Sequence, residues 1–453
     1  MCESLLQQIW DYFKDTYGYE IGDSVDLFER QKNLLEFVMG IGKDLEQSVF
    51  TEIGTGYRGR ILKRDGKEFE FEGNRRQSIH GLFGVIEYKR AYYVCRQKGG
   101  GSYTPLDEKL GIGKKHTPGC NYFMSLFTSQ GVYEKSIGRF HEIFRPGGRD
   151  LISMRKVLDM DYELGSRLEQ IRGQEIERAY EKGEEIEREN VVEGMMAVSV
   201  DATKVREKLG EEITSGGRKR YKIGFKDAKI ATISEVRWDR KREEAKCVNT
   251  TYVSAEEHAD DFFKRIWVEM NRRNNDLSRQ PIVFLGDGAE WIWNRTGDLS
   301  NEMSLFILDF YHAGKHLADI CKVLYGEETQ EFWQHFKRWK DLFYRGKVQK
   351  VIDQLREIMR GTGKQSTLES LLGAIKYFKD NKEKMHYDKY RKMKLPIGSG
   401  TVESACKNVI GGRLKSGGMT WSPSGADGML QIRSSVESGR FCSDFKCTLK
   451  MAS

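Results

Sequence analysis

The stretch "PIVFLGDGAEWIW", from Pro281 to Trp293, decides the fold class of this 453-residue chain. Its run of apolar residues, Ile282 to Leu285, is typical of a buried strand. The strand ends in Gly-Asp-Gly, with Asp287 between the two glycines. Because ligands in open α/β sheets collect at the carboxyl ends of strands, Asp287 stands where a functional residue is expected.

The segments on either side of this strand predict the rest of the sheet. Upstream, three strand candidates and an amphipathic helix follow one another: "MMAVSVD", "KIATISEVRW", "NTTYVSA" and "EEHADDFFKRIWVEMNRR". Downstream, "SLFILDFYHAGKHLADICKVL" is a strand that turns into a helix. The order β-β-β-α-β-α-β-α predicts an α/β fold, with a mixed sheet and helices on its faces.

The change of pattern along the chain predicts the domain boundaries. We expect a helical region at 1–66, a small β-rich region at 67–118, a region with a helix-turn-helix-like pair and a charged, solvated connecting helix at 119–190, the first part of the catalytic domain at 191–318, an all-helical insertion at 319–394, the last part at 395–441 and a loosely held tail at 442–453. An ordinary helical hairpin explains the pair at 121–144 equally well.

Composition narrows the class of protein. A net charge of +7 is compatible with a polyanionic partner. The eight cysteines are scattered, which predicts reduced thiols in a cytoplasmic protein. The acidic N-terminus is unlike a signal peptide, and no apolar run approaches membrane-spanning length. No P-loop motif is present, so the chain is not expected to be a P-loop ATPase.

Three acids in this order predict a metal-dependent site. Asp201 ends the apolar run "MMAVSVD", Asp287 ends the next buried strand, and Glu403 begins a helix in "LPIGSGTVESACKNVIGGRLKSGGMTW". Carboxylates delivered by separate strands can share Mg²⁺, which prefers oxygen ligands. Two such metals stabilise the attacking and leaving oxygens of an in-line displacement at phosphorus.

Three cations follow Glu403 and fit the same chemistry. Lys407, Arg413 and Lys415 lie along and beyond the helix, where they would hold DNA phosphates. Each feature has a plainer explanation: a strand-terminal Asp is often a helix cap, and a Glu with Lys at i+4 is usually a surface pair. The order Asp, Asp, Glu favours the metal site over these explanations.

At these residues the chain resembles a DDE transposase of the bacterial insertion-sequence type. The similarity is to the Kra-type family, which is related more distantly to Mutator-like and hAT-like transposases. It is carried by "VSVDATKVR", "FLGDGAEWIWN", "ILDFYHAGKHL" and "PIGSGTVESACKNVIGGRLKSGGMTWS", and it also touches "GVIEYKRAYYVC" and "TPLDEKLGIG". The resemblance therefore covers most of the chain from about 80 to 440.

The resemblance implies a catalytic domain of the ribonuclease H-like fold, with Asp201, Asp287 and Glu403 as catalytic residues and ligands of Mg²⁺ or Mn²⁺. The long helical segment before Glu403 resembles the insertion domain of longer relatives. The segment "DFYH" resembles their Asp/Cys-x-x-His signature, so Asp309 and His312 would lie close to the active site as supporting residues.

Two alternatives concern individual residues near the acids. Asp309 also ends a strand and competes with Asp287 for the place of second acid; the flanking glycines favour Asp287. His312 and His316 have the i, i+4 spacing of a helical zinc pair, but no third zinc ligand is evident nearby.

The chain departs from the family pattern at "YYVCRQKGG". Relatives often carry Cys-x-x-Cys here, whereas Cys95 is followed three positions later by Lys98. One cysteine is not half a zinc site, so we expect a degenerate zinc ribbon without structural zinc. Trp291 and Trp293 are expected in the core, while Trp421 is either core or a base-stacking residue.

The sequence thus predicts a transposase that binds terminal inverted repeats and target DNA as a homodimer or larger assembly, in the cytoplasm and associated with the nucleoid. It would catalyse strand cleavage and strand transfer. Two alternatives stay open: a ribonuclease H-like nuclease that does not join strands, and an inactive transposase-derived protein that only binds DNA.

Overall fold

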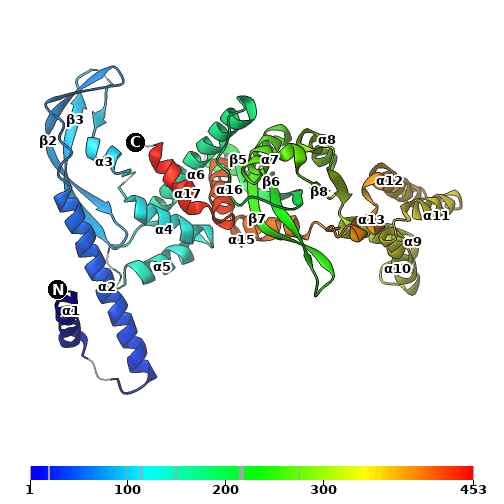
Figure 1. Ribbon diagram of the computed structural model, residues 1–453, viewed down its shortest axis with the longest axis horizontal. Coiled ribbons are helices and arrows are strands. Elements are labelled where there is room, and N and C mark those ends of the chain that lie inside the picture. The colour runs from blue at the N-terminus through cyan, green and yellow to red at the C-terminus, as the bar shows by residue number, and fades with distance from the viewer. Residues whose placement is uncertain are drawn as a thin grey trace. The chain divides into compact units, whose positions relative to one another are not determined.

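The computed structural model describes residues 2–18, 21–97, 99–112, 115–146, 148, 150–213, 219–274 and 276–451. The chain separates into two compact units, each built on a sheet of its own (Figure 1). Unit 1 comprises residues 1–168 together with 442–453, and unit 2 comprises residues 169–441.

Unit 1 is built on an antiparallel sheet with the order β1-β2-β3-β4. Its strands are β1 (Ile61–Arg64), β2 (Lys67–His80), β3 (Val85–Cys95) and β4 (Ser102–Tyr103). Its helices are α1 (Cys2–Tyr17), α2 (Ser24–Glu52), α3 (Pro105–Lys109), α4 (Pro118–Ser129), α5 (Tyr133–Phe144) and, continuing into unit 2, α6 (Met154–Glu175). The N-terminal helices thus end at Glu52, and β1 occupies part of the region expected to be helical.

Helices α4 and α5 form the expected pair. The hydroxyl of Thr117 caps α4 by accepting the N–H of Cys120. Asp161 of α6 is buried and accepts hydrogen bonds from Ser125 (2.6 Å) and Thr128 (2.7 Å) of α4. These contacts suit a helix-turn-helix and an ordinary hairpin equally, so the helix-turn-helix stays a prediction.

Two expectations for the charged and C-terminal segments were wrong. Helix α6 is not simply solvated, because Val157, Leu164 and other apolar residues on one face are buried. The C-terminal segment is not loose: it forms α17 (Phe441–Lys450), and Phe445 contacts Tyr122 with ring centroids 5.3 Å apart. In both segments, apolar residues one helical turn apart are enough to bury one face.

Unit 2 contains a five-stranded mixed sheet with the order β7-β6-β5-β8-β9. Its strands are β5 (Met196–Ile213), β6 (Lys219–Asp239), β7 (Glu244–Ala255), β8 (Ile282–Gly286) and β9 (Leu305–Leu308). The first helices are α7 (Ala259–Arg272), α8 (Glu290–Leu299) and α9 (Phe310–Tyr325). This confirms the predicted order β-β-β-α-β-α-β-α and the mixed α/β class.

Strand pairing follows from the connections. β5, β6 and β7 are joined by hairpins and pair antiparallel, whereas β8 and β9 follow crossover helices and run parallel to β5. Along β5, Met196 and Val198 join a core with residues of α7 and α8, and Ala197 joins a core with residues of α9. The two faces of the sheet are therefore covered by different helices.

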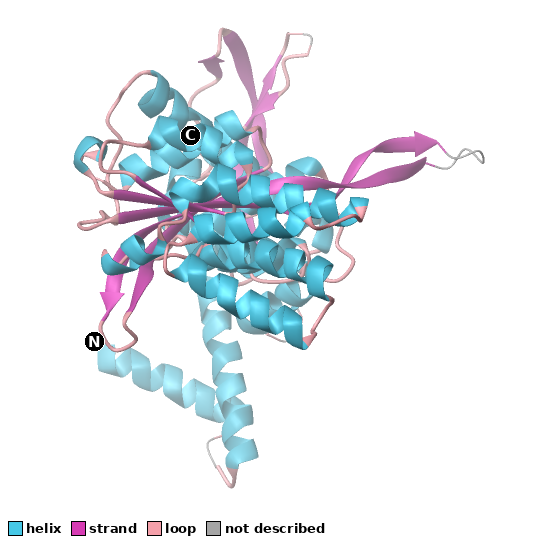
Figure 2. Cartoon of the chain, turned by 90° about the vertical axis from the view of Figure 1, so that its right-hand side faces the viewer, coloured by secondary structure: helices cyan, strands magenta, loops and turns pink. Residues whose placement is uncertain are grey.

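The strand that carries Asp201 is longer than expected. Asp201 does not end β5, which continues to Ile213 and pairs with β6 along this whole length. Beyond the sheet these two strands extend as a two-stranded ribbon (Figure 2). The parallel pairing with β8 ends at Ser199 and Leu285, so Asp201 still lies at the carboxyl edge of the parallel part of the sheet.

Between β9 and Glu403 the described residues form helices joined by loops, without a strand. It contains α10 (Gln330–Tyr344), α11 (Val348–Arg360), α12 (Gln365–Asn381) and α13 (Tyr387–Lys392). Trp339 and Phe378 are buried in the core that these helices share with α9. None of the helices in the described part of the chain has the length and apolar character needed to span a bilayer.

Candidate functional site

The turn after β8 presents Asp287. Its carboxylate accepts the N–H of Ala289 at 3.0 Å, and its backbone carbonyl accepts the hydroxyl of Tyr377 at 2.9 Å. Gly288 has φ +94°, and a Cβ there would lie 2.9 Å from the Tyr377 ring. Glycine is therefore required where helix α12 approaches this turn.

Asp201 lies on the α9 face of β5 and is partly buried. Its carboxylate accepts the N–H of Ala202 at 2.7 Å and the thiol of Cys406 at 3.3 Å. Burial raises the pKa of Asp201; these two hydrogen bonds lower it, and the negative charge of Asp287 raises it again.

Glu403 reaches the same neighbourhood from α14 (Gly400–Ala405). Its side chain is exposed, yet burial of part of it raises the pKa of Glu403, and the charges of Asp309 and Asp201 add to this rise. His312 acts in the opposite sense on both Asp201 and Glu403. Asp201 therefore interacts electrostatically with both Asp287 and Glu403, and His312 interacts with Asp201 and Glu403.

The case for a metal site rests on the kind of ligand atoms that the acids offer. Among the described residues, no three His, Cys, Asp or Glu side chains form a group that could hold a metal ion as they stand. Mg²⁺, however, commonly takes one or two protein carboxylates and completes its shell with water and substrate phosphates. Asp201 and Asp287 are oxygen donors of this kind, and Asp287 adds to the electrostatic rise in the pKa of Asp201.

Asp309 is fully buried and has a positioning role in the structure. Its carboxylate caps α9 by accepting the N–H of His312, and it also accepts the N–H of Ser399 at the start of α14. A single carboxylate therefore joins the helix of His312 to the helix of Glu403. This supports the choice of half-buried Asp287 over fully buried Asp309 as the second acid.

His312 and His316 contact each other and the helical segment. Their Nε2 atoms are 3.2 Å apart, and the His316 ring stacks on Tyr377 with centroids 4.0 Å apart. Burial and the neighbouring His312 lower the pKa of His316. No third ligand joins the pair among the described residues, so the zinc interpretation gains no support from the geometry.

The three predicted cations do not share one environment. Lys407 is exposed, and exposed Lys415 donates a hydrogen bond to Thr203 of β5. Arg413, however, is buried with 1% of its surface exposed, and its guanidinium lies over the Trp421 ring at 4.7 Å. The prediction that Arg413 contacts DNA was wrong, because its side chain packs inside the fold.

Trp421 is a core residue, and Trp291 and Trp293 pack against the core. Trp421 is buried, donates its Nε1–H to the carbonyl of Leu414 at 3.1 Å, and exchanges backbone hydrogen bonds with Arg206 and Lys208 of β5. Trp291 and Trp293 pack against the core of α7 and α8. A base-stacking role for Trp421 therefore does not fit its position.

At Cys95, the structure shows a buried thiol that packs with Phe69, Ala91 and Tyr93. Lys98, where the resemblance leads one to expect a second cysteine, lies outside the described residues.

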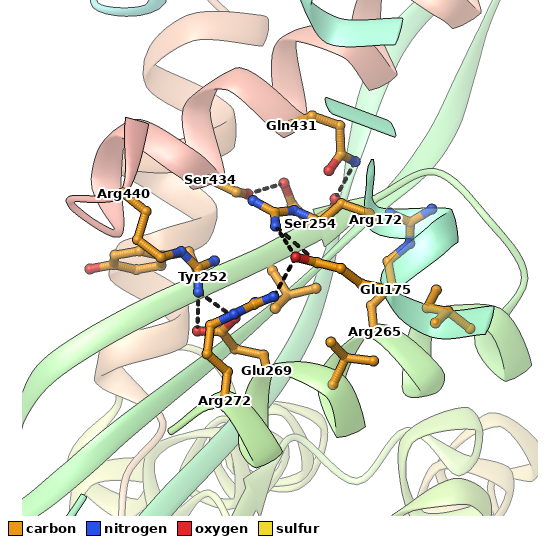
Figure 3. A pocket seen from close by; sticks show the side chains of 13 residues that line it. Arg172, Glu175, Tyr252, Ser254, Arg265, Glu269, Arg272, Gln431, Ser434 and Arg440 are labelled. Atoms are coloured by element: carbon orange, nitrogen blue, oxygen red, sulfur yellow. Dashed lines mark hydrogen bonds and ion pairs between the residues drawn. The ribbon is translucent and has the colours of Figure 1, made fainter. Parts of the chain in front are cut away.

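A separate charged cluster in unit 2 is structural (Figure 3). Arg440 and Arg272 both pair with buried Glu269, at 2.6 and 2.8 Å, and Arg272 also pairs with Glu175 of α6. Burial raises the pKa of Glu269, but the two guanidinium groups outweigh it and hold it at about 2. The cavity among these groups measures only about 30 Å³, so the cluster fastens helices together and leaves no room for a substrate.

Comparison with known proteins identifies the family. The family model described as "Uncharacterised protein family (UPF0236)" matches residues 23–185 and 215–447. The chain belongs to the UPF0236 family. Two similar relatives are UPF0236 proteins TTE2489 and TTE0402 of Caldanaerobacter subterraneus subsp. tengcongensis. Each is 23% identical over 428 residues, covering 92% of this chain and 80% and 75% of the relative, respectively.

The residues matched by the UPF0236 family model include two of the three acids. Asp287 and Glu403 lie within the matched residues, while Asp201 lies in the unmatched stretch 186–214. Two further residues of the site were missed from sequence: Tyr377 and Cys406. Cys406 follows Glu403 by three positions, a spacing that places both on one side of a helix and could have indicated it. Nothing in the local sequence of α12 indicates the contact of Tyr377 with Asp287.

Proposed function

We propose that this UPF0236 protein is a DDE-type DNA transposase whose unit 2 is a catalytic domain of the ribonuclease H-like fold. The observation that carries the proposal is that Asp201 of β5 interacts electrostatically both with Asp287, at the end of β8, and with Glu403 of α14. The mixed sheet, with its acids at the carboxyl edge of parallel strands, is the scaffold that this chemistry requires.

Asp201 and Asp287 would hold Mg²⁺ or Mn²⁺, and Glu403 would complete the ligation. When bound, the metals supply polarisation of the phosphate and a more acidic attacking water. Asp309 and His312 position the helices that carry these groups. Exposed Lys407 and Lys415 bind the DNA backbone beside the acids.

The reaction has two in-line displacements at phosphorus. In the first, water attacks a phosphodiester at the element's terminal inverted repeat, and the 3′-oxygen leaves as a 3′-hydroxyl. In the second, this hydroxyl attacks a target phosphodiester, and a target 3′-oxygen leaves in turn. Because two ends must be joined to one target, the active form is a homodimer or larger assembly on nucleoid DNA.

Joining of pre-cut ends tests this function. A labelled terminal-repeat duplex with a free 3′-hydroxyl is incubated with target DNA and Mg²⁺, using wild type, Asp287→Asn, Glu403→Gln and the exposed control Glu331→Gln. We expect joining by wild type and Glu331→Gln only, with DNA binding retained by all four. Cleavage of uncut repeats without joining would indicate a nuclease, and binding without either reaction would indicate an inactive DNA-binding protein.

A further inference from the structure

Within the described residues, the ribbon beyond Lys204 pairs with no further strand, and a single isolated bridge joins Glu207 to Trp421. Parallel pairing of β5 with β8 ends at Ser199, and pairing of β6 with β7 ends at Lys229. We define the ribbon arm as residues 204–213 and 220–227, which pair with each other through the β5–β6 register. Two strands alone are marginally stable in water, so an arm of about 30 Å is expected to have a binding partner.

One face of the arm is covered near its base. Val205 and Glu207 are buried, and Trp421 pairs with the adjacent backbone of Arg206 and Lys208. The opposite face carries three cross-strand pairs: Lys204 opposite Asp227, Arg206 opposite Phe225, and Lys208 opposite Ile223. Side chains on this second face stand in one row because alternate residues of a strand share a face.

The open face combines cations with exposed rings. Phe225, Ile223 and Tyr221 are 65%, 41% and 47% exposed, and the ammonium of Lys208 lies over the Tyr221 ring at 4.6 Å. Three cations share this face with two acids: Asp227, which pairs with Lys204 at 2.9 Å, and Glu211, which stands opposite Tyr221 in the register. A basic row interleaved with exposed aromatic and apolar side chains is a surface suited to nucleic acid.

We propose that this face of the ribbon arm docks onto double-stranded DNA at a site separate from the three acids. This proposal adds a DNA-docking surface to the proposed function, and the choice of DNA as the polyanion rests on that function. A two-stranded ribbon fits the major groove, which is about 12 Å wide. Lys204, Arg206 and Lys208 contact phosphates, and Tyr221 and Phe225 contact sugars or base edges.

A second copy of the chain is a poorer occupant of the same face. Pairing two arms face to face brings together two faces that each carry three cations and two acids, and a net like charge across an interface is unfavourable. Asp201 lies on the other face of β5, since it shares register parity with Val205 and not with Lys204. The arm therefore holds duplex away from the strand being cut.

The test measures binding of a fluorescent random-sequence duplex to the full chain without divalent metal. The triple variant Lys204→Gln/Arg206→Gln/Lys208→Gln is compared with the control Lys337→Gln/Lys347→Gln/Lys350→Gln, which removes the same charge from exposed positions of the helical insertion. We expect the arm variant to bind duplex at least about tenfold more weakly. The magnitude of its slope of log K against log salt concentration should fall by about 2 to 3, because each lost phosphate contact accounts for roughly 0.9. The control should change neither value.

Hydrogen exchange on the wild type gives a second readout that needs no variant. Residues 204–213 and 220–227 should gain amide protection when duplex is added. Equal affinity of the two triple variants, no protection of the arm, or protection that depends on protein concentration instead of DNA would each overturn the proposal; the last would assign the face to a second copy. Failure of strand joining with arm-dependent binding intact would refute only the proposed function.

Discussion

At the scale of single residues, the site depends on one close approach between a turn and a helix. Gly288 adopts φ +94°, and Tyr377 occupies the space where a side chain would stand. The hydroxyl of the same tyrosine binds the carbonyl of Asp287. The position of the second acid is thus set by a residue of the helical insertion.

Gly288→Ala should lower the free energy of unfolding of unit 2 by about 1–3 kcal/mol, since the left-handed backbone and the contact with Tyr377 both disfavour a side chain. Gly417→Ala is the matched control, because a Cβ there meets nothing within 4 Å. Urea unfolding followed by tryptophan fluorescence measures the difference. Equal midpoints for the two variants would contradict the account of this turn.

Tyr377→Phe removes only the hydroxyl that binds Asp287 and keeps the ring that stacks on His316. We expect strand joining to fall by about 10- to 100-fold, as for other groups that orient ligands, with little change in stability. Tyr344→Phe, an exposed tyrosine of the insertion, should behave as wild type. A normal joining rate in Tyr377→Phe would show that this hydrogen bond does not position Asp287.

Asp287 and Glu403 could be found from sequence because a glycine-flanked strand end and an acid in the first turn of a helix are local patterns. Tyr377 and the burial of Arg413 could not, because both depend on contacts between segments distant in sequence. The sequence correctly placed Arg413 on the helical segment that follows Glu403. It gave no information about which face of this segment is covered by the rest of the protein.

At the scale of elements, the helical insertion supports the sheet that carries the acids. Trp339 of α10 is 1% exposed and packs in the core that includes β8, β9 and α9. Its Nε1–H binds Gln354 of α11 at 2.7 Å. The insertion is therefore part of the core of unit 2 and not an appended module.

Trp339→Ala should destabilise unit 2 by about 3–5 kcal/mol, the range for removing a large buried aromatic side chain. Trp333→Ala, on the same helix but 45% exposed, should change stability by less than about 1 kcal/mol. Guanidinium unfolding of both variants gives the comparison. Similar small losses would mean that the insertion does not share the core.

The succession of strands and helices along the chain could be predicted because apolar runs mark buried strands, but the length of β5 could not. From Leu209 onward both faces of the ribbon are largely exposed, so the alternation of apolar and polar residues that marks a half-buried strand is missing there. Hydrogen bonding to β6, which no local pattern shows, maintains the strand there.

At the scale of the whole molecule, the two units differ in how burial shifts the pKa values of their titratable groups. In unit 1, burial lowers the pKa values of His80 and His141 to about 4, helped by neighbouring cations. In unit 2, burial beside Glu207 raises the pKa of Glu256 to about 9, Lys226 opposes this, and burial raises the pKa of Asp427 to about 6.

Lowering the pH from 8 to 5.5 should therefore act oppositely on the two units. Below pH 6.5 the two histidines bind protons in unfolded unit 1 but stay neutral in the folded unit. The stability of unit 1 therefore falls as the pH falls. Folded unit 2 takes up protons on Glu256 and Asp427 more readily than the unfolded chain, so its stability rises. Hydrogen exchange, resolved by peptide, measures both; slopes of the same sign would contradict the assignment.

The central claim is that Asp201, Asp287 and Glu403 bind divalent metal when DNA is present, and Mn²⁺ binding followed by electron paramagnetic resonance tests it most directly. The protein is mixed with a terminal-repeat duplex and titrated with Mn²⁺, comparing wild type, Asp287→Asn, Glu403→Gln and Glu331→Gln. We predict saturable Mn²⁺ uptake by wild type and Glu331→Gln, weakened at least about tenfold in the two site variants. Equal uptake by all four proteins would contradict the account.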